Sequence, residues 1–496
     1  MPDILYDLAV IGSGPAGQKA AVAAAKLGKR VAVVDRRDMI GGVCIHTGTI
    51  PSKTLREAIL YLSGFRQRTF YGRDYTLQDR ISVADLVSRV RTVLDRETEI
   101  VRSQLKRNGI ETVHGTARFA DPHTLVVETP GGQVPLAAER VLIACGTRPA
   151  HSASIPLDGR HIFDSDQLLT VDTLGKQMIV VGAGVIGLEY ASMLTALGHT
   201  VTVIDQRPTM LDFLDQEMIE ALSYHMRRQG ATFRLGETVT GVERDARGRV
   251  LARLESGKTV QGDALLYTVG RQANTDGLAL EAAGLQADSR GRIIVNGAGQ
   301  TAVPHIYAAG DVIGFPSLAS TSMEQGRLAA CHMFGLPCVS RPELMPYGVY
   351  SVPELSMVGR TEGELTRARI PYEVGMAKYA ELARGQIIGD DIGFLKILFH
   401  PLTRKVLGVH VIGEGASEII HIGQAVLTLD GTIDYFRDTV FNYPTMAECY
   451  KVAAFNGLNK LDLDEQPVSS PARDLEETIA DDVTQLRDAT AEMATT

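Results

Sequence analysis

Two segments of this 496-residue chain repeat the pattern G-x-G-x-x-G, one over residues 12–17 and the other over residues 182–187. Each copy follows a short apolar run and precedes a helix-like stretch. Each is also followed, at the same spacing, by an acidic residue: Asp35 after the first copy and Asp205 after the second. One such pattern is weak, because glycine is common. Two copies with matched acids predict two sites that bind dinucleotides.

The residue types suit the chemistry of a pyrophosphate group. In each copy the first glycine allows a tight turn, the second lets the backbone approach the phosphates, and the third lets helix and strand pack closely. A helix that begins at the turn offers unpaired N–H groups and about half a positive charge. Asp35 and Asp205 can accept hydrogen bonds from ribose hydroxyls. Two such sites on one chain predict electron transfer between two cofactors.

Apolar runs separated by helix-like stretches must position these residues. We expect strands over residues 6–11 and 31–34 around the first motif, and over 178–181 and 201–204 around the second. Each unit is followed by a further apolar strand that ends in a turn at Gly146 or Gly270, where we expect the chain to cross between domains. A third strand, over residues 305–309, ends at the carboxylate of Asp311.

From about residue 347 the pattern changes. Alternating strands over residues 394–399 and 406–412 and a helical stretch over 418–429 predict an α+β third domain. The fold class is therefore α/β, with two Rossmann-like dinucleotide-binding domains and an α+β C-terminal domain.

Composition excludes several classes of function. Most of the net charge of −9 comes from acids after residue 461, so the remaining body is near neutral and has no basic stripe for nucleic acid. No apolar run reaches the ~20 residues that a membrane span requires. Five cysteines cannot form a disulfide framework, and we expect a cytoplasmic protein. No histidines or cysteines show metal-ligand spacing, so we expect no metal site.

Three further segments carry a family resemblance. Residues 41–53, the pair Gly310-Asp311 and residues 441–448 resemble motifs of the two-dinucleotide-fold flavoprotein reductases, the family of dihydrolipoamide dehydrogenase and glutathione reductase. The resemblance covers roughly residues 5–460. It implies that the first fold holds FAD and that the second holds NAD(H) or NADP(H). It also implies that Lys53 lies beside flavin N5 and pairs with Glu189.

By this resemblance, Asp35 contacts the adenosine ribose of FAD, Asp311 contacts the ribitol, and the backbone of Gly115 lies near the adenine. The full set expected at FAD is Gly12, Gly14, Gly17, Asp35, Arg36, Gly42, Cys44, Lys53, Gly115, Gly146 and Asp311. The set expected at the nicotinamide dinucleotide is Gly182, Gly184, Gly187, Glu189, Asp205, Arg207 and Gly270.

The resemblance also implies a domain order and an assembly. We expect an FAD-binding domain in two parts (1–150 and 275–345), an NAD(P)-binding domain (151–274), an interface or dimerisation domain (346–462) and an acidic tail (463–496). A homodimer is the minimum assembly, with higher oligomers left open. In such a dimer Tyr443 and Glu448 act on the partner's site.

Two departures from the family decide the expected reaction. Disulfide reductases have a second cysteine where this chain has Thr49, so Cys44 lacks its partner. They also have a histidine base where this chain has Tyr443, and tyrosine is a poor base at neutral pH. The transhydrogenase branch of the family shares both departures. Its reaction passes hydride from NADPH to NAD⁺ through flavin N5 without a redox disulfide, with Lys53, Glu189 and Tyr443 as candidate catalytic residues.

Two alternatives stay open from sequence. A quinone reductase or diaphorase on the same fold needs only access to the flavin edge. A non-catalytic protein that binds FAD or NAD is the other, although a sensor has no use for a flavin beside a nicotinamide pocket. One tension also stays open: Asp205 favours the free 2′-hydroxyl of NAD(H), whereas Arg207 can reach the 2′-phosphate of NADP(H).

Overall fold

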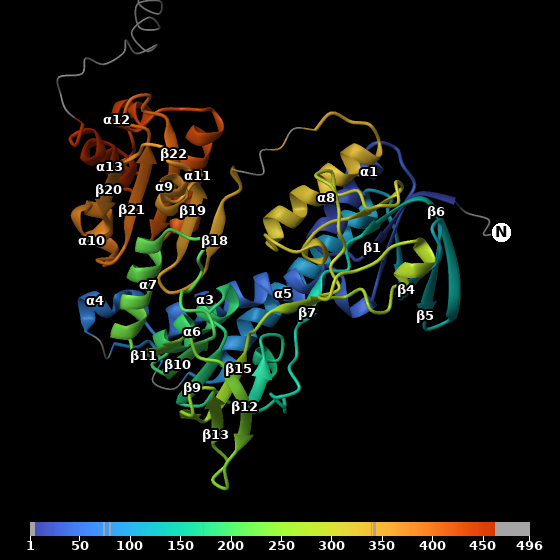
Figure 1. The fold of residues 1–496 in the computed structure, drawn as a ribbon, viewed down its shortest axis with the longest axis horizontal. Coiled ribbons are helices and arrows are strands. Elements are labelled where there is room, and N and C mark those ends of the chain that lie inside the picture. Colours follow the sequence, from blue (N-terminus) through green and yellow to red (C-terminus); the bar gives the residue numbers. More distant parts are fainter. Residues whose placement is uncertain are drawn as a thin grey trace, which may run out of the picture.

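A computed structural model describes residues 5–72, 75–78, 81–171, 173–338, 340 and 344–461, with the side chain of Arg37 left out. The acidic tail expected over 463–496 lies outside the described residues. The described chain forms three α/β units, which stand at the corners of a triangle in Figure 1. Mixed helix-on-sheet layers of this kind confirm the predicted fold class.

The first unit is built on a seven-stranded sheet. Its strands lie in the order β3 (Glu111–His114), β2 (Val31–Asp35), β1 (Leu5–Ile11), β6 (Gly132–Ile143), β5 (Thr124–Thr129) and β4 (Thr116–Asp121), with β17 (Ile306–Ala308) also paired to β6. The strands around β1 are parallel, whereas β4, β5 and the first half of β6 form an antiparallel meander. The long β6 therefore joins two kinds of pairing in one sheet.

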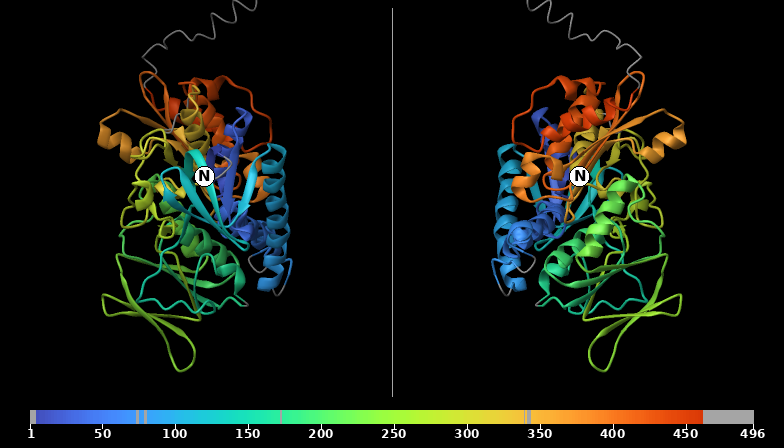
Figure 2. Two further views of the ribbon diagram at one scale, coloured as in Figure 1. Left: turned by 90° about the vertical axis from the view of Figure 1, so that its right-hand side faces the viewer. Right: turned by 90° about the vertical axis from the view of Figure 1, so that its left-hand side faces the viewer.

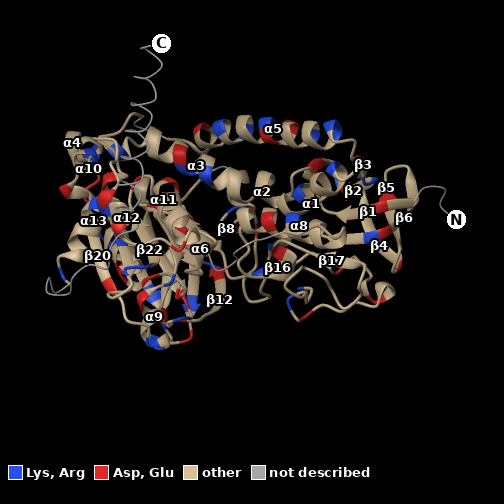
Figure 3. Cartoon of the chain, turned by 90° about the horizontal axis from the view of Figure 1, so that it is seen from above, with Lys and Arg blue, Asp and Glu red and all other residues tan. Residues whose placement is uncertain are grey.

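Three helices pack on one face of this sheet, α1 (Pro15–Lys26), α5 (Val83–Arg107) and α8 (Ala319–Met333). Helices α1 and α8 cross so closely that a Cβ on Gly326 would lie 2.1 Å from the carbonyl oxygen of Ala16. Along the exposed side of α5, basic and acidic residues are mixed rather than gathered into a stripe (Figure 3).

The second unit repeats the parallel part of the first. Its five strands are all parallel, in the order β11 (Ala231–Leu235), β10 (Thr200–Asp205), β9 (Gln177–Val181), β15 (Ala264–Tyr267) and β8 (Ile162–Asp164). Helices α6 (Val185–Ala196) and α7 (Gln216–Arg228) accompany it. A small antiparallel sheet of β12 (Val239–Arg244), β13 (Val250–Leu254) and β14 (Thr259–Gly262) projects from this unit (Figures 1 and 2).

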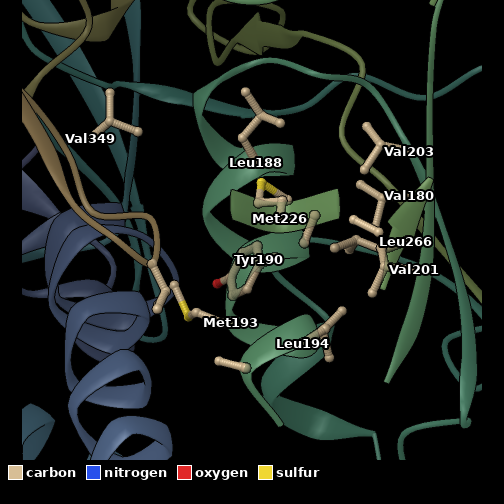
Figure 4. Close-up of a cluster of buried hydrophobic side chains, with 14 of the residues drawn as sticks. Val180, Leu188, Tyr190, Met193, Leu194, Val201, Val203, Met226, Leu266 and Val349 are labelled. Atoms are coloured by element: carbon tan, nitrogen blue, oxygen red, sulfur yellow. The ribbon is translucent and has the colours of Figure 1, made fainter. Parts of the chain in front are cut away.

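Helix α6 is buried on nearly every side. Figure 4 shows Leu188, Tyr190, Met193 and Leu194 of this helix between the strand residues of its own sheet and the blue helix α3 (Thr49–Leu62) of the first unit. Every residue from Gly187 to Ala196 is buried. Most of its side chains are apolar, as burial on all sides requires, and its polar residues Glu189, Ser192 and Thr195 are hydrogen-bonded. The contact with α3 fixes the second unit against the first.

The chain passes between these units twice, at neighbouring places. Strand β7 (Thr147–Pro149) follows the turn at Gly146, and β16 (Arg271–Ala273) follows the turn at Gly270. The two strands pair antiparallel, with Arg271 opposite Pro149. The expected crossings therefore lie side by side.

The third unit is an antiparallel sheet in the order β18 (Tyr347–Val349), β19 (Leu355–Gly359), β22 (Val406–Ile412), β21 (Phe394–Phe399) and β20 (Glu373–Lys378). Its helices are α9 (Glu362–Ala368), α10 (Ala383–Ile388), α11 (Ala416–Thr428), α12 (Asp434–Asp438) and α13 (Glu448–Leu458). The strands predicted over 394–399 and 406–412 are found with these bounds, and the predicted helix begins two residues earlier than expected.

One covalent feature was missed by the sequence analysis. Cys331, near the end of α8, and Cys338 form a disulfide, although the low cysteine count favoured free thiols throughout. Cys44, Cys145 and Cys449 are free. Among the described helices, none is both long and apolar enough to cross a membrane.

A buried lysine joins the second and third units. Lys396 on β21 has no exposed side-chain surface, and its Nζ donates to Asp215 (2.9 Å), to Glu217 (2.6 Å) and to Glu362. Asp215 and Glu217 belong to the start of α7, whereas Glu362 begins α9. Burial alone would lower the pKa of Lys396, but these three carboxylates raise it above the usual lysine value. The ammonium thus holds α7 on the third sheet.

We expect Lys396→Met to lower the free energy of unfolding by about 3 to 5 kcal/mol, because it leaves the buried carboxylate of Asp215 without its cation. Urea unfolding followed by circular dichroism measures the change. Lys378→Met on the neighbouring β20, where the side chain is exposed, is the control and should change stability by less than about 0.5 kcal/mol. Equal stability of the two variants would contradict a stabilising role for the Lys396 cluster.

Candidate dinucleotide-binding and redox site

Two of the three glycines in the first turn leave no room for a side chain, whereas the middle one does. Gly12 has φ of +103°, and a Cβ there would lie 2.3 Å from the carbonyl oxygen of Ala144. A Cβ on Gly17 would lie 1.9 Å from the carbonyl oxygen of Gly12. A Cβ on Gly14, in contrast, would have no atom within 4 Å. The fold itself therefore requires the outer glycines, and the middle one leaves the backbone accessible to a ligand.

The second turn repeats this geometry. Gly182 has φ of +108°, and its Cβ would lie 2.7 Å from Oγ1 of Thr268. A Cβ on Gly187 would again lie 1.9 Å from a carbonyl oxygen, that of Gly182. A Cβ on Gly184 would again meet nothing within 4 Å. The two motifs match in shape as well as in sequence.

Both helices that follow the turns lack a side-chain cap. Gly14 is the N-cap of α1 and Gly184 is the N-cap of α6, and neither first turn contains an acidic residue. The first N–H groups of an uncapped helix have no intrahelical acceptor. Together with the open middle glycine, these N–H groups fit the pyrophosphate of FAD at the first turn and of a nicotinamide dinucleotide at the second.

Asp35 ends β2 and is held against the first turn. Its Oδ2 accepts hydrogen bonds of 2.6 Å from both the N–H and the hydroxyl of Ser13, and its Oδ1 accepts one of 2.8 Å from the N–H of Arg36. Burial raises the pKa of Asp35, and the bonds from Ser13 oppose that rise. The Ser13 hydroxyl also accepts from the N–H of Gly41 (2.9 Å). Sequence reasoning missed Ser13, although it stands inside the motif.

Asp205 ends β10 in the equivalent place but has a different partner. Its Oδ2 accepts from the N–H of Ala183 (2.6 Å), and its two oxygens accept from Nε (3.0 Å) and Nη2 (2.8 Å) of Arg207. Burial alone would raise the pKa of Asp205, but the hydrogen bonds from Arg207 outweigh it and lower the pKa. Asp205 is buried and Arg207 is half-exposed, so the guanidinium forms the outer surface of the pair.

Lys53 and Glu189 form the ion pair that the resemblance implied. Nζ of Lys53, on α3, lies 2.8 Å and 3.0 Å from the two carboxylate oxygens of Glu189, on α6. The backbone N–H of Tyr350 donates to the same carboxylate (2.9 Å), and Lys53 Nζ lies 4.8 Å from the centre of the Tyr350 ring. The site therefore draws on all three units. Tyr350 could not be found from sequence, because only the fold brings it to Lys53.

Asp311 lies where both chain crossings meet. The hydroxyl of Thr147 on β7 donates to Asp311 (3.2 Å), and Nε of Arg271 on β16 donates to that hydroxyl (2.7 Å). The N–H of Gly310 donates to the side chain of Gln325 on α8 (2.9 Å). Helix α8 begins at Ala319, eight residues after Asp311. Thr147, Arg271 and Gln325 were not anticipated.

Four more predicted glycines lie around the first turn and the crossings. A Cβ on Gly42 would lie 2.9 Å from the Cα of Gly14. The N–H of Gly115 donates to the carbonyl of Asp35 (3.0 Å). Gly146 and Gly270 both have positive φ, and each accepts a backbone hydrogen bond through its carbonyl. Gly42 and Gly115 therefore belong to the same neighbourhood as Gly14 and Asp35.

Cys44, on the short helix α2 (Gly42–His46), is a free thiol. Burial raises its pKa, and a hydrogen bond with the Thr49 side chain only partly offsets the rise. The disulfide of Cys331 lies about 18 Å along α8 from the start of that helix, at a rise of about 1.5 Å per residue. It does not replace the missing partner of Cys44.

Within one chain, Tyr443 does not join this site. Its side chain is 72% exposed, and no hydrogen bond or ring contact links it to Lys53 or Glu189 in the part of the chain that the structure describes. Glu448, at the start of α13, has a buried Oε2 with no hydrogen-bond partner. A role for either residue at a partner's site stays a prediction.

Comparison with known proteins supports the same arrangement. Residues 6–326 match the model of the pyridine nucleotide-disulphide oxidoreductases, and residues 345–454 match the dimerisation domain of that family. The chain belongs to this family. It is therefore an oxidoreductase of a type that uses a flavin and a pyridine nucleotide, and it carries a dimerisation domain.

Two curated relatives are similar over nearly their whole length. One is named soluble pyridine nucleotide transhydrogenase, from Mycobacterium tuberculosis (strain ATCC 25177 / H37Ra). It is 54% identical over 458 residues, which is 92% of this chain and 98% of the relative. A protein of the same name from Escherichia coli O9:H4 (strain HS) is 47% identical over 461 residues, again 92% and 98% of the two chains.

Solved structures with the same fold are more distant in sequence. LpdA from Mycobacterium tuberculosis superposes with a TM-score of 0.84 at 29% identity, covering 90% of this chain and 99% of that one. The HOCl-induced flavoprotein disulfide reductase RclA from Escherichia coli gives 0.81 at 27% identity, covering 91% and 99%. Members of one fold thus include disulfide reductases, and the reaction must be argued from the site.

The two kinds of glycine predict different defects. We expect Gly14→Ala to fold normally, since φ there is −64° and the added Cβ meets no atom, but to lose most of its flavin, because the methyl blocks the backbone from the phosphates. Gly17→Ala should instead fail to fold or melt well below the wild type. Flavin absorbance and thermal melting of the purified variants measure both.

Gly277→Ala is the matched control, since its Cβ also meets open space but lies away from the turn. It should keep both flavin and stability. Full flavin content in Gly14→Ala would contradict the placement of the pyrophosphate.

Proposed function

We propose that this protein is an FAD-dependent NAD(P)⁺ transhydrogenase, in which hydride passes from NADPH to NAD⁺ without a redox disulfide. The observation that carries the proposal is the Lys53–Glu189 pair, which joins α3 of the first unit to α6 of the second. The cysteine expected at this site, Cys44, is a free thiol. The relatives named soluble pyridine nucleotide transhydrogenase support the same reaction. The Si-specific class of that reaction follows from the resemblance.

FAD would be held by the first turn, by Asp35 at the ribose and by Asp311 at the ribitol. When bound, FAD supplies a carrier that accepts a hydride from one nicotinamide and gives it to another. The chain contributes position rather than a reactive side chain. Because the two nicotinamide couples have nearly equal potentials, the reaction needs no strong driving force and no thiol relay.

The Glu189 carboxylate is fixed from two directions, by Nζ of Lys53 and by the N–H of Tyr350. Such a pair can hold the flavin and the nicotinamide in a defined geometry, and correct positioning of two reactants accelerates the reaction between them. Cys44 has the properties of a packing residue, because the raised pKa of its thiol makes it a poor nucleophile at neutral pH. Tyr443 remains a candidate contributed by the partner subunit.

A transhydrogenase must bind both nicotinamide dinucleotides at one site. Asp205 suits the free 2′-hydroxyl of NAD(H), and Arg207 suits the 2′-phosphate of NADP(H). Their ion pair removes the expected repulsion, because the carboxylate that would face the phosphate is already neutralised. The outer edge of the half-exposed Arg207 can contact a 2′-phosphate while the guanidinium stays paired with Asp205, so one site can accept either substrate.

The assembly and location follow the family. We propose a homodimer through residues 345–454, with Glu448 and Tyr443 completing the partner's site, and we leave higher oligomers open. We place the protein in the cytoplasm, where both dinucleotide pools are found.

The reaction is tested anaerobically in two steps. NADPH should bleach the flavin of the holoenzyme, and NAD⁺ added next should restore the flavin colour while NADH appears. A colour that NADPH cannot bleach would indicate a non-catalytic binding protein. Turnover with a quinone far above turnover with thio-NAD⁺ would indicate a quinone reductase, and rapid reduction of lipoamide would indicate a disulfide reductase.

Arg207→Ala should weaken NADPH binding by about 10- to 100-fold, because a charge-assisted hydrogen bond is worth roughly 1.5 to 3 kcal/mol. NADH binding should change by less than about threefold by the same reasoning, since the ribose hydroxyl needs Asp205 alone. Dissociation constants from anaerobic flavin titration measure the two effects. The exposed Arg247→Ala is the control. Equal losses for both dinucleotides would remove the proposed role of Arg207.

A further inference from the structure

A cavity of about 600 Å³ lies where the three units meet, away from the glycine turns. Its walls come from the later part of α3, from residues 65–70, from the end of α7, from α10 and the segment after it, and from loops of the third unit. Helices α4 (Arg68–Tyr71) and α10 lie side by side in Figures 1 and 3, and the hydroxyl of Thr69 donates to the carbonyl of Gly389 (2.9 Å). The volume is within the usual range of small-molecule sites.

The cavity has more positive than negative charge. Five arginines line it, against four acids. The acids Glu354 and Glu414 pair with two of the arginines, and Asp390 accepts three backbone N–H groups. Arg228, at the end of α7, and Arg384, on α10, have no ion pair with any described residue. These two guanidinium groups are available to an anion.

A buried histidine in the same wall lacks a hydrogen-bond partner. His225, on α7, is 5% exposed, and its Nε2 is buried without an acceptor or donor in the described chain. Burial, helped by the charge of Arg228, lowers the pKa of His225 to about 4. The ring is therefore neutral at neutral pH. A buried polar nitrogen left unpaired is unfavourable, and the neutral ring adds no negative charge to the cavity wall.

Aromatic and aliphatic side chains form the rest of the wall near His225. The Phe65 ring packs edge-on against the His225 ring, with centroids 6.2 Å apart, and the Arg68 guanidinium lies 5.4 Å from the Phe65 ring centre. Phe70 and Ile387 line the cavity and are each more than half exposed. Such surfaces suit a flat apolar group more than a small inorganic ion.

We propose that this cavity binds a small aromatic anion, with its phosphate or carboxylate between Arg228 and Arg384 and its ring against Phe65 and beside His225. Because the walls come from all three units, the bound anion also strengthens their docking. Arg56, which lines the cavity, lies one turn along α3 from Lys53, so occupancy bears on the placement of the Lys53–Glu189 pair. The proposal does not depend on the identity of the hydride acceptor.

The test uses 1-naphthyl phosphate and the FAD-loaded protein saturated with NAD⁺, so that the dinucleotide sites are filled. Isothermal titration calorimetry should show one saturable site per chain, with affinity at least tenfold above that of inorganic phosphate and of 1-naphthol. The double variant Arg228→Ala, Arg384→Ala should bind at least tenfold more weakly. Both side chains are exposed, so the variant should fold, which its melting temperature without ligand checks.

Arg227→Ala is the matched control, because Arg227 is a neighbouring exposed arginine of α7 that packs over Phe233 outside the cavity. It should bind the naphthyl phosphate as the wild type does. Bound probe should raise the melting temperature of the wild type and of this control, but not of the double variant.

Three results would overturn the proposal: no saturable binding, equal binding by wild type and double variant, or binding of inorganic phosphate or 1-naphthol as tight as that of the combined probe. None of these results bears on the anaerobic hydride transfer, so the two proposals fail separately.

Discussion

The ion pair of Lys53 and Glu189 sets the main constraint on this fold. Glu189 is buried, and a buried carboxylate is unfavourable unless it is paired and hydrogen-bonded. Its two donors come from α3 of the first unit and from the backbone after β18 of the third, whereas the carboxylate itself belongs to α6 of the second. All three units must therefore dock before this one group is satisfied. The site is therefore complete only when the three units have reached their final arrangement.

The duplicated turns show how one local geometry serves two ligands. In both copies a Cβ on either outer glycine would clash with neighbouring atoms, so the backbone follows the same path in each. The copies differ in what holds the acid. Asp35 is fixed by Ser13, a neutral partner within the turn, whereas Asp205 is fixed by Arg207, a half-exposed cation at the surface. The first arrangement suits one permanently bound dinucleotide, and the second suits dinucleotides that exchange.

Local pattern made much of this structure predictable. The strands over 394–399 and 406–412 are short apolar runs, and the glycine motifs also lie on short apolar strands, so the fold class and both turns could be predicted from the sequence. The Lys53–Glu189 pair came only from the family resemblance, since no periodicity links positions so far apart. Tyr350, Thr147 and the Lys396 cluster were missed for the same reason: their partners are brought together by tertiary packing. The disulfide of Cys331 was missed because composition describes the average of a chain and says nothing about a single close pair.

In the proposed transhydrogenase, the anchoring of helix α7 leaves selection between dinucleotides to a side chain rather than to domain motion. Its first turn is held on the third sheet by Lys396, and its last turn forms a wall of the three-unit cavity through His225 and Arg228. The anchor at its start makes the helix resist displacement, because moving it would separate Lys396 from the buried Asp215. The segment between β10 and α7, which carries Arg207, is therefore fixed at both of its ends. The half-exposed Arg207 on this segment is the group proposed to distinguish a hydroxyl from a phosphate.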